Sequence, residues 1–521
     1  MEGRPPKAHS DVIVVGAGHN GLVAALLLAR NGLDVLVLED KEVIGGAVRS
    51  ERPFVKAPDL TSSTGAYLLG VMPPELMRLA GVHIPLKRRD PYYFLPRRDK
   101  GYLLFSSDTQ AMRSQFLAFF SERDWDANAA MMAEIAAIRD DVAPTWLQEP
   151  VSIEETAERF VRPALRKTFV DLCRKPVRDY IERFGFQSDL VKAMYAVTDG
   201  LSGLYGTWDT PGTGMNFLVH NMCRLPGSGG TWMIVEGGMG VVARCFADEA
   251  RRCGVTIETG RSVVKIHVEG RAVRGVVTRQ GDEVRTRTAV VNADPFRMRE
   301  LVGAENFPPA HNARIDGYRK PGSTFKLNLA LKELPTFTCL PEDRGQYGST
   351  MHLLPDEDVV MHSLVDSFHA MREGQLPDFP AIEWYIHTTV DPTLRDPAGN
   401  HSSALFVQGV PYELNGTTWD QKVERYSKHL LSICDRFAPG TSDLVVDMMP
   451  LPPKAIESYF GMTYGHIHHV DNSFGFADRL PYAQPVAGLY SCSAGTHPAG
   501  SVIGCAGHNS AMRVLKDLGR I

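Results

Sequence analysis

The sequence lacks a large excess of charge of either sign. Among its 521 residues, 56 lysines and arginines face 61 aspartates and glutamates, which gives a formal net charge of −5. A surface this evenly charged does not attract nucleic acid over its whole area. We therefore expect no nucleic acid among the partners of this protein.

Close cysteine pairs are also missing. The 8 cysteines are scattered along the chain, and none stands in a CxxC motif. This spacing excludes a zinc ribbon, a thioredoxin-like site and the paired cysteines of a disulfide reductase. Isolated cysteines in a long chain are typical of buried thiols in a reducing compartment.

A long apolar run is absent near the start of the chain. Residues 22–38 are the most apolar stretch there, but Arg30 and Asp34 interrupt it, whereas a membrane-spanning helix needs about 20 predominantly apolar residues. Only ten residues precede the first predicted strand, which is short for a signal peptide. We expect a soluble, cytoplasmic protein without a transmembrane segment, and we leave peripheral contact with a membrane open.

Residues 11–38 carry the pattern of a strand, a turn, a helix and a second strand. DVIVV at 11–15 predicts a strand buried on both faces, and a helical pattern at 22–31 and an apolar run at 34–38 follow. The turn has the spacing GxGxxG and contains Gly16, Ala17, Gly18, His19, Asn20 and Gly21. Its glycines allow a tight turn and the close approach of a pyrophosphate, which the helix N-terminus favours electrostatically.

Glu39 ends the second predicted strand, 23 residues after Gly16. At this distance a carboxylate accepts hydrogen bonds from ribose hydroxyls and repels a 2′-phosphate. The segment therefore predicts a site for FAD or NAD rather than NADP. The neighbouring Asp40 is a further candidate for cofactor binding.

Two more loops contain the residue types expected where a loop contacts a dinucleotide. The first is a glycine doublet followed by an arginine, and it contains Gly45, Gly46, Ala47 and Arg49. Arg49 either neutralises phosphates or is a solvated surface arginine. The second lies between a predicted strand at 489–492 and a predicted helix at 502–518, and its candidates are Gly495, Thr496, Ser501 and Val502. Its small residues let a flat ring lie on the backbone, and the helix N-terminus stabilises negative charge there.

Six motifs, spread over almost the entire chain, carry a resemblance to a known family. They are GAGHNGLVAA (16–25), IGGAVRSE (44–51), VEGGMG (235–240), VVNADP (290–295), VDPTL (390–394) and GTHPAG (495–500). The chain resembles the phytoene-desaturase-like branch of the flavin amine oxidase superfamily, and most sharply the pyridine nucleotide-disulphide oxidoreductase domain-containing protein 2 group. The resemblance implies an FAD-dependent oxidoreductase, with the mitochondrial matrix as an alternative location.

The resemblance also implies an α/β fold in which a Rossmann-like FAD-binding domain, split in sequence, is interleaved with an α+β substrate domain that contains a mixed sheet and helices. The FAD-binding domain would comprise residues 1–95, 232–300 and 481–521, and the substrate domain residues 96–231 and 301–480.

The same resemblance assigns roles to two residues of the middle segment. The backbone of Val263 would hold the adenine, and Ala293 would lie where the chain returns to the cofactor. The sequence departs from the family at Ser493 and Ser501, where glycine is common. These departures concern the detail of the flavin pocket.

Residues 238–243, GMGVVA, imitate a second dinucleotide motif, with Glu258 following 20 residues after Gly238. One interpretation is a separate NAD(P)H domain. The resemblance instead assigns this segment to the FAD-binding domain, and we favour that interpretation.

The substrate region contains one candidate catalytic residue, Lys326. Strand patterns at 325–331, 383–388 and 404–408 suggest the sheet that roofs the active site in flavin oxidases of this superfamily. The segment of Lys326 resembles the one whose lysine holds a water near flavin N5 in amine oxidases. There its ammonium would assist oxygen reduction or orient the substrate. The alternative is a strand lysine paired to a carboxylate.

Three clustered histidines invite a metal site. In an extended segment His466 and His468 would share a face, with His469 next in sequence. Only Asp471 stands near enough in sequence to complete a ligand set, so we expect no metal. Packing, or a position near the flavin edge, is the favoured interpretation.

The resemblance to polyene desaturases implies the chemistry. A hydride would move from a C–H bond of a small hydrophobic substrate, such as a polyene or lipid, to flavin N5. Amine oxidation, an FAD-dependent isomerisation and a catalytically weak flavoprotein acting as a regulator or interaction scaffold are the alternatives. The sequence leaves open the electron acceptor, for which oxygen and a quinone are candidates, and the oligomeric state.

Overall fold

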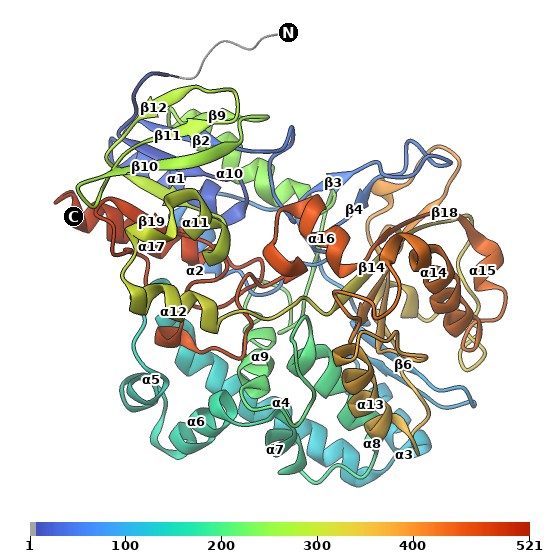
Figure 1. The fold of residues 1–521 in the computed structure, drawn as a ribbon. Coiled ribbons are helices and arrows are strands. Elements are labelled where there is room, and N and C mark those ends of the chain that lie inside the picture. The colour runs from blue at the N-terminus through green and yellow to red at the C-terminus, as the bar shows by residue number, and fades with distance from the viewer. Residues whose placement is uncertain (1–6) are drawn as a thin grey trace.

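The computed structural model describes residues 7–521, which fold around two large sheets (Figure 1). The first sheet is parallel, with its strands in the order β19-β13-β1-β2-β9. These strands are β1 (Val12–Val15), β2 (Val35–Leu38), β9 (Thr256–Glu258), β13 (Ala289–Val291) and β19 (Leu489–Ser491). The sheet therefore joins segments from both ends and the middle of the chain.

Both faces of this sheet are covered. Val12 and Val14 of β1 pack in one apolar layer with three helices, whereas Ile13 and Val15 pack in another with a three-stranded antiparallel sheet. The helices are α1 (His19–Arg30), α10 (Gly240–Arg252) and α17 (Cys505–Asp517). The small sheet comprises β10 (Val263–Glu269), β11 (Ala272–Thr278) and β12 (Glu283–Arg285), and α11 (Pro295–Val302) lies beside it. Because successive residues of β1 enter opposite apolar layers, every position of VIVV is apolar.

The second large sheet is mixed, in the order β18-β14-β17-β16-β15-β6-β7. Its strands are β6 (Tyr93–Pro96), β7 (Tyr102–Phe105), β14 (Thr324–Leu331), β15 (Thr350–Leu353), β16 (Ile382–Ile386), β17 (His401–Gln408) and β18 (Val445–Leu451). Only β15 and β6 pair in parallel within it.

The two faces of β14 differ in chemistry. Phe325, Leu327 and Leu329 pack into an apolar core with α14 (Trp419–Asp435). Lys326 and Asn328 therefore point to the opposite face, since side chains alternate along a strand. This second face looks toward the centre of the molecule.

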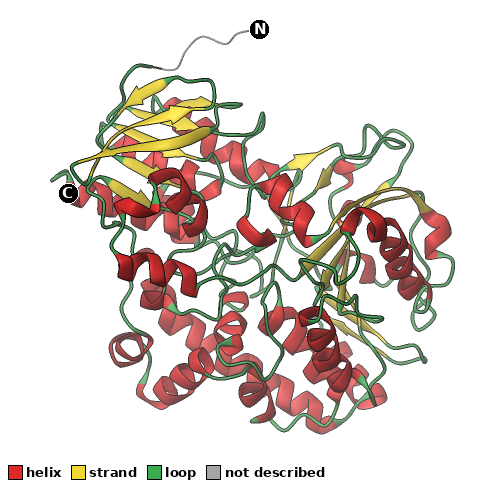
Figure 2. Cartoon of the chain, viewed as in Figure 1, coloured by secondary structure: helices red, strands yellow, loops and turns green. Residues whose placement is uncertain are grey.

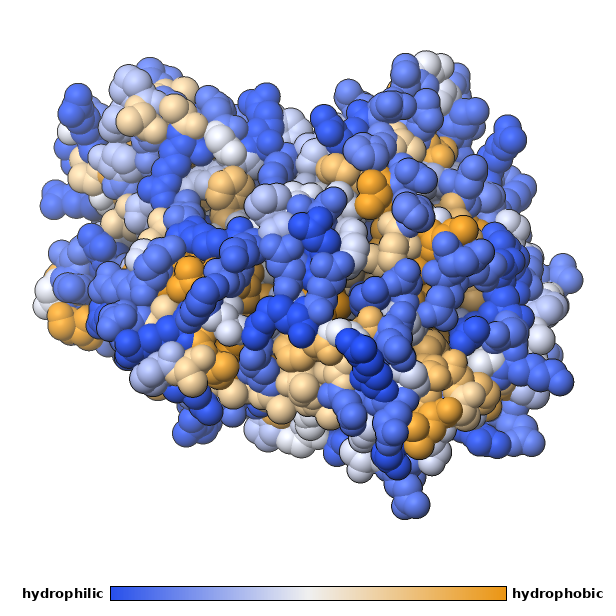
Figure 3. All heavy atoms as spheres, turned by 90° about the horizontal axis from the view of Figure 1, so that it is seen from below, coloured by the Kyte–Doolittle hydropathy of each residue, from blue (hydrophilic) through white to orange (hydrophobic). Residues whose placement is uncertain are grey.

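Helices form the third region of the molecule, shown in red at the bottom of Figure 2. They are α3 (Thr109–Phe119), α4 (Glu122–Val142), α5 (Ile153–Phe160), α6 (Arg166–Arg174), α7 (Val177–Glu182), α8 (Asp189–Tyr195), α9 (Thr213–His220) and α13 (Val360–Arg372). The long helix α4 begins where the Ser121 hydroxyl accepts a hydrogen bond from the Asp124 N–H at 3.0 Å. Seen from below, this region is mainly hydrophilic, with apolar residues in scattered groups (Figure 3).

Short elements connect these regions. They are β3 (Ser50–Glu51), β4 (Ser62–Ser63), β5 (Leu86–Lys87), β8 (Ile234–Val235), α2 (Pro74–Leu79), α12 (Pro309–Gly317), α15 (Thr441–Leu444) and α16 (Pro453–Phe460). Across residues 7–521, no helix has the length and apolar character to cross a bilayer.

The α/β class with a split Rossmann-like part is confirmed. All strands of the parallel sheet fall in the three ranges expected for the FAD-binding domain. Residues 1–6 of the first range lie outside the described residues. β6 already belongs to the mixed sheet, so the expected boundary at residue 95 falls inside a strand.

The second glycine motif, at residues 238–243, opens α10, and the strand after it, β9, pairs with β2. That segment completes the same parallel sheet rather than forming its own.

Candidate functional site

A cavity of about 650 Å³ runs between the parallel sheet, the mixed sheet and the helical region. Most residues expected to bind the cofactor line it. They are Gly16, Gly18, His19, Asn20, Glu39, Asp40, Gly45, Gly46, Ala47, Arg49, Val263, Ala293, Ser501 and Val502. Lys326 lines the same cavity from the mixed sheet. Segments from both chain ends thus meet at one space.

Four of the expected residues lie behind the cavity wall. Ala17 is buried, and Gly21 packs so closely that a Cβ there would lie 2.2 Å from the Gly16 carbonyl oxygen. Gly495 and Thr496 form the buried turn after β19, where the Thr496 hydroxyl donates to the Ser493 carbonyl at 2.8 Å. These residues shape the backbone that others present to the cavity.

The glycines form a cradle that side chains would fill. A Cβ on Gly18 would lie 2.8 Å from the end of the Asn292 side-chain amide, and a Cβ on Gly46 would lie 3.7 Å from the Gly18 Cα. The Gly45 N–H donates to the Ala17 carbonyl at 2.9 Å, which ties the two loops together. This bare backbone beside the start of α1 fits the pyrophosphate of a dinucleotide.

Glu39 is fixed at the end of β2. Its carboxylate accepts hydrogen bonds from the Ala17 N–H at 2.7 Å and from the Lys41 N–H at 3.0 Å. Burial raises its pKa, against the effect of these two hydrogen bonds. The carboxylate lines the cavity at the position where an acid meets the ribose hydroxyls.

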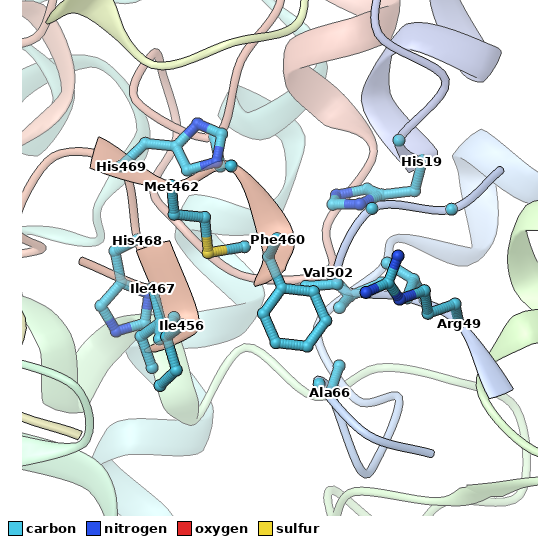
Figure 4. A pocket seen from close by; sticks show the side chains of 18 of the residues that line it. His19, Arg49, Ala66, Ile456, Phe460, Met462, Ile467, His468, His469 and Val502 are labelled. Carbon is cyan, nitrogen blue, oxygen red and sulfur yellow. The ribbon is translucent and has the colours of Figure 1, made fainter. Parts of the chain in front are cut away.

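Arg49 is buried, so the interpretation as a solvated arginine is wrong. Its guanidinium lies 3.2 Å from Glu51 and stacks on the rings of Tyr459 and Phe460, with centroid distances of 4.4 and 4.9 Å. Figure 4 shows Arg49 on the same side of the pocket as His19, opposite Met462. Arg49 thus brings a buried cation to the cavity wall.

His19 stands at the start of α1 and lines the cavity. Burial and the neighbouring His469 lower the pKa of its imidazole to about 4, so the ring is neutral near pH 7. Its Nε2 atom and the amide oxygen of Asn20 are buried and lack a hydrogen-bond partner within the described chain. Such orphaned atoms at a glycine cradle fit a bound polar group such as FAD.

The inner end of the cavity lies under the mixed sheet. Lys326 pairs with Phe406 on β17, and Phe406 pairs with Glu383 on β16, so these three residues form one row across the sheet. The Lys326 ammonium lies 4.1 Å from the ring centroid of Tyr67 and 4.5 Å from that of Phe406. Burial lowers the pKa of Lys326 to about 7.

Lys326 forms no direct ion pair in the described part of the chain, but the Glu383 carboxylate raises its pKa against the effect of burial, so the lysine is linked electrostatically to a carboxylate. Glu383 instead accepts hydrogen bonds from the Tyr385 hydroxyl and, at 2.8 Å, from the Gln408 amide. Burial raises the pKa of Glu383 to about 7. Lys326 and Glu383 therefore both change protonation near neutral pH.

Sequence reasoning missed Glu383 and Arg89, which line this inner end. Glu383 can be recognised in the sequence, because a carboxylate inside the apolar run IEWYI marks a strand position that cannot face an apolar core. Arg89 stands in an irregular charged segment, RRDP, and nothing in the sequence sets it apart.

The histidines of the cluster turn to different partners. His466 lies 3.4 Å from Asp471, whereas His468 bonds to the Ser202 carbonyl at 2.9 Å. No group of three metal-ligating side chains gathers anywhere in residues 7–521. His468 and His469 line the cavity, and Figure 4 shows them beside Met462.

The parallel sheet, the glycine cradle and the enclosed chamber define a flavin-dependent oxidoreductase whose cofactor is FAD. The chain belongs to the family of flavin containing amine oxidoreductases, which matches residues 21–359.

Similar proteins agree with this assignment. The pyridine nucleotide-disulfide oxidoreductase domain-containing protein 2 of Rattus norvegicus is 33% identical over 558 residues and covers 98% of this chain and 94% of its own. A zeta-carotene-forming phytoene desaturase of Myxococcus xanthus is 26% identical, over 79% of this chain and 74% of its own. The solved structure of a putrescine oxidase variant shares the fold, with a TM-score of 0.59, 14% identity and coverage of 99% and 100%. The resemblance drawn from the motifs is confirmed.

Proposed function

We propose that this oxidoreductase removes a hydride from a C–H bond of a small hydrophobic substrate. The observation that carries the proposal is the continuity of the cavity from the glycine cradle to a chamber in which aromatic and aliphatic side chains stand beside a few charged ones. The aromatic and aliphatic residues include Tyr67, Leu68, Tyr93, Trp232, Tyr385, Phe406, Ile456, Phe460, Met462 and Ile467, and the charged ones include Arg89, Lys326 and Glu383. FAD, when bound, accepts the hydride at its N5 atom.

The walls of the chamber orient the substrate and exclude water. Tyr67, Leu68 and Phe406 are all buried, so a hydrocarbon chain held against them is desolvated. These walls keep water away from the reacting C–H bond and from the reduced cofactor. The protein would thus supply orientation, and Lys326 the nearby charge.

Amine oxidation, the second candidate, is favoured by the family and by the fold of a putrescine oxidase. A substrate ammonium would seek an aromatic pair in the chamber. The rings of Tyr67 and Phe406 form such a pair, but the Lys326 ammonium already lies against both. When Lys326 is protonated, it repels a second cation there, which supports the hydrophobic substrate over the amine.

The experiment is an anaerobic mixing of the FAD-loaded protein with phytoene, oleate, benzylamine and putrescine, followed by the flavin absorbance. We expect bleaching with an apolar substrate and none with the two amines. Bleaching by the amines alone would replace the proposal with amine oxidation. No bleaching by any compound would favour the regulator or scaffold.

A further inference from the structure

Arg89 is a buried cation that forms no ion pair within residues 7–521. Its side chain is only 2% exposed, although it lines the cavity. Its Nε donates to the Trp232 carbonyl at 3.0 Å, and one terminal nitrogen donates to the Thr350 hydroxyl at 2.8 Å. The other terminal nitrogen, Nη2, has no hydrogen-bond partner among residues 7–521.

An unpaired buried guanidinium is costly, because burial removes the water that stabilises its charge. An arginine also keeps its proton in a protein, so it does not become neutral as a buried lysine does. Both formed hydrogen bonds are to neutral oxygens, and no ion pair to Arg89 exists in the described chain. The free energy of the site therefore improves when an anion enters the cavity.

The buried acids Glu383 and Asp199 do not fill this role. Glu383 interacts electrostatically with Arg89 but forms no ion pair with it, since its carboxylate is held by Tyr385 on β16 and Gln408 on β17. Burial raises the pKa of Glu383 to about 7 and that of Asp199 to about 8, so neither carries a full negative charge at neutral pH. Lys326 lines the same space and adds positive charge when protonated.

We propose that Arg89 anchors the carboxylate of the substrate, so that the substrate class is an apolar molecule with one carboxylate end. The inference rests on the proposed function and names the substrate more closely. A carboxylate matches the planar donors of a guanidinium and balances one fixed positive charge. A phosphate dianion would bring a second negative charge that only a protonated Lys326 offsets. The apolar body would then lie along Tyr67, Trp232 and Phe406.

The test measures binding rather than turnover. The FAD-loaded protein is titrated by calorimetry with octanoate, 1-octanol and octylamine, which share a chain and differ in charge. We expect octanoate to bind about tenfold more tightly than either of the others, as one charge-assisted hydrogen-bonded pair implies. Equal or tighter binding of octanol or octylamine would overturn the proposal without any variant.

Variants then assign the effect to Arg89. We expect Arg89→Gln to weaken octanoate binding about tenfold while octanol binding stays unchanged, and Arg89→Lys to restore part of the loss. The matched control is Arg88→Gln, because Arg88 is exposed and lies 3.3 Å from Asp90. Unchanged octanoate binding in Arg89→Gln would refute the anchor. If that variant fails to fold, two other results together refute it: Arg89→Lys binds octanoate with full affinity, and the wild type binds octanol as tightly as octanoate.

The two proposals fail in different ways. Octanoate binding that depends on Arg89, with no bleaching by any apolar compound, would retain the anchor and remove the hydride chemistry. Bleaching by phytoene, with no preference for octanoate over octanol, would retain the chemistry and remove the anchor.

Discussion

Lys326 and Glu383 face the cavity from the same row of the mixed sheet, with Phe406 between them. Burial moves both pKa values to about 7, lowering that of the lysine and raising that of the glutamate. Their charges therefore change within the range in which an enzyme works. Such perturbed groups in a buried chamber are typical of functional sites.

Replacement of the lysine tests its role. We expect Lys326→Met to keep its FAD content, because the cradle is built from other elements, and to slow flavin reduction or reoxidation at least about tenfold. In the wild type the ammonium-dependent rate should fall as pH rises through about 7, and the variant should lack this step. Stopped-flow absorbance measures both rates.

The control for this variant is Lys332→Met, one residue past β14, where the side chain is exposed. Its rates should match those of the wild type. Wild-type rates and pH profile in Lys326→Met would remove Lys326 from the mechanism.

Gly18 offers a second test at this scale. A Cβ there would come within 2.8 Å of the Asn292 side chain and would occupy the cradle. We expect Gly18→Ala to fold but to bind FAD at least about tenfold more weakly, whereas Gly317→Ala, with open space around the new methyl, binds it normally. Flavin-to-protein absorbance ratios of the purified proteins measure this, and a fully loaded Gly18→Ala would contradict the cradle.

At the scale of elements, α11 is joined to the loop before the histidine cluster by one carboxylate. Asp294 caps the helix by accepting from the Arg297 N–H at 2.9 Å, and it also accepts from the N–H and hydroxyl of Thr463 at 3.1 and 2.8 Å. By contrast, Asp108 caps α3 near the surface with one bond of 2.9 Å to the Ala111 N–H.

This difference predicts unequal costs. Asp294→Ala should lower the free energy of unfolding by roughly 2–4 kcal/mol, because it leaves three partly buried donors unpaired, and Asp108→Ala by about 1 kcal/mol. Chemical denaturation of the two variants and the wild type checks the order. An equal loss of unfolding free energy in the two variants would mean that the hydrogen bonds from Thr463 to Asp294 add no stability.

Local patterns predict several strands and helices of both large sheets. β1, α1 and β2 follow from VIVV, the glycine turn and the following apolar run, and β14 follows from the alternation in FKLNLAL. β6 was missed although its hairpin partner β7 is close in sequence, because Tyr93–Pro96 has only four residues and ends in a proline, which is rare inside a sheet. The histidine segment is a loop rather than an extended strand, with His469 in a left-handed conformation at φ 62°.

At the scale of the whole molecule, the cavity is enclosed by segments that no local pattern connects. Arg89 and Glu383 reach it from strands and loops almost 300 residues apart, so only the tertiary fold makes them neighbours of one chamber. The split of the nucleotide region followed from the family resemblance, not from periodicity. The cradle was therefore predictable and the chamber was not.

Buried histidines give the whole protein a pH dependence. Burial lowers the pKa of His220, His387 and His497 to about 4, and that of His352 and His468 to about 3. The unfolded chain, with values near 6.5, binds more protons than the folded one between about pH 6.5 and pH 3. Stability is therefore full above about pH 6.5 and falls as pH decreases through that window.

We expect the midpoint of thermal unfolding to fall steeply between pH 6.5 and 4, since each unit of pKa difference corresponds to about 1.4 kcal/mol. Thermal melts of the FAD-loaded protein at several pH values measure it. A constant midpoint from pH 7 to pH 4.5 would show that these histidines are charged or solvated when folded.

The most direct test of the central claim is the mass balance of one anaerobic turnover with an apolar substrate. The FAD-loaded protein is mixed with the compound that bleaches its flavin, and the product is weighed by mass spectrometry. We expect a product that has lost two hydrogens, in an amount equal to the FAD reduced, with no ammonia released. Release of ammonia, or flavin reduction without loss of hydrogen from the substrate, would contradict it.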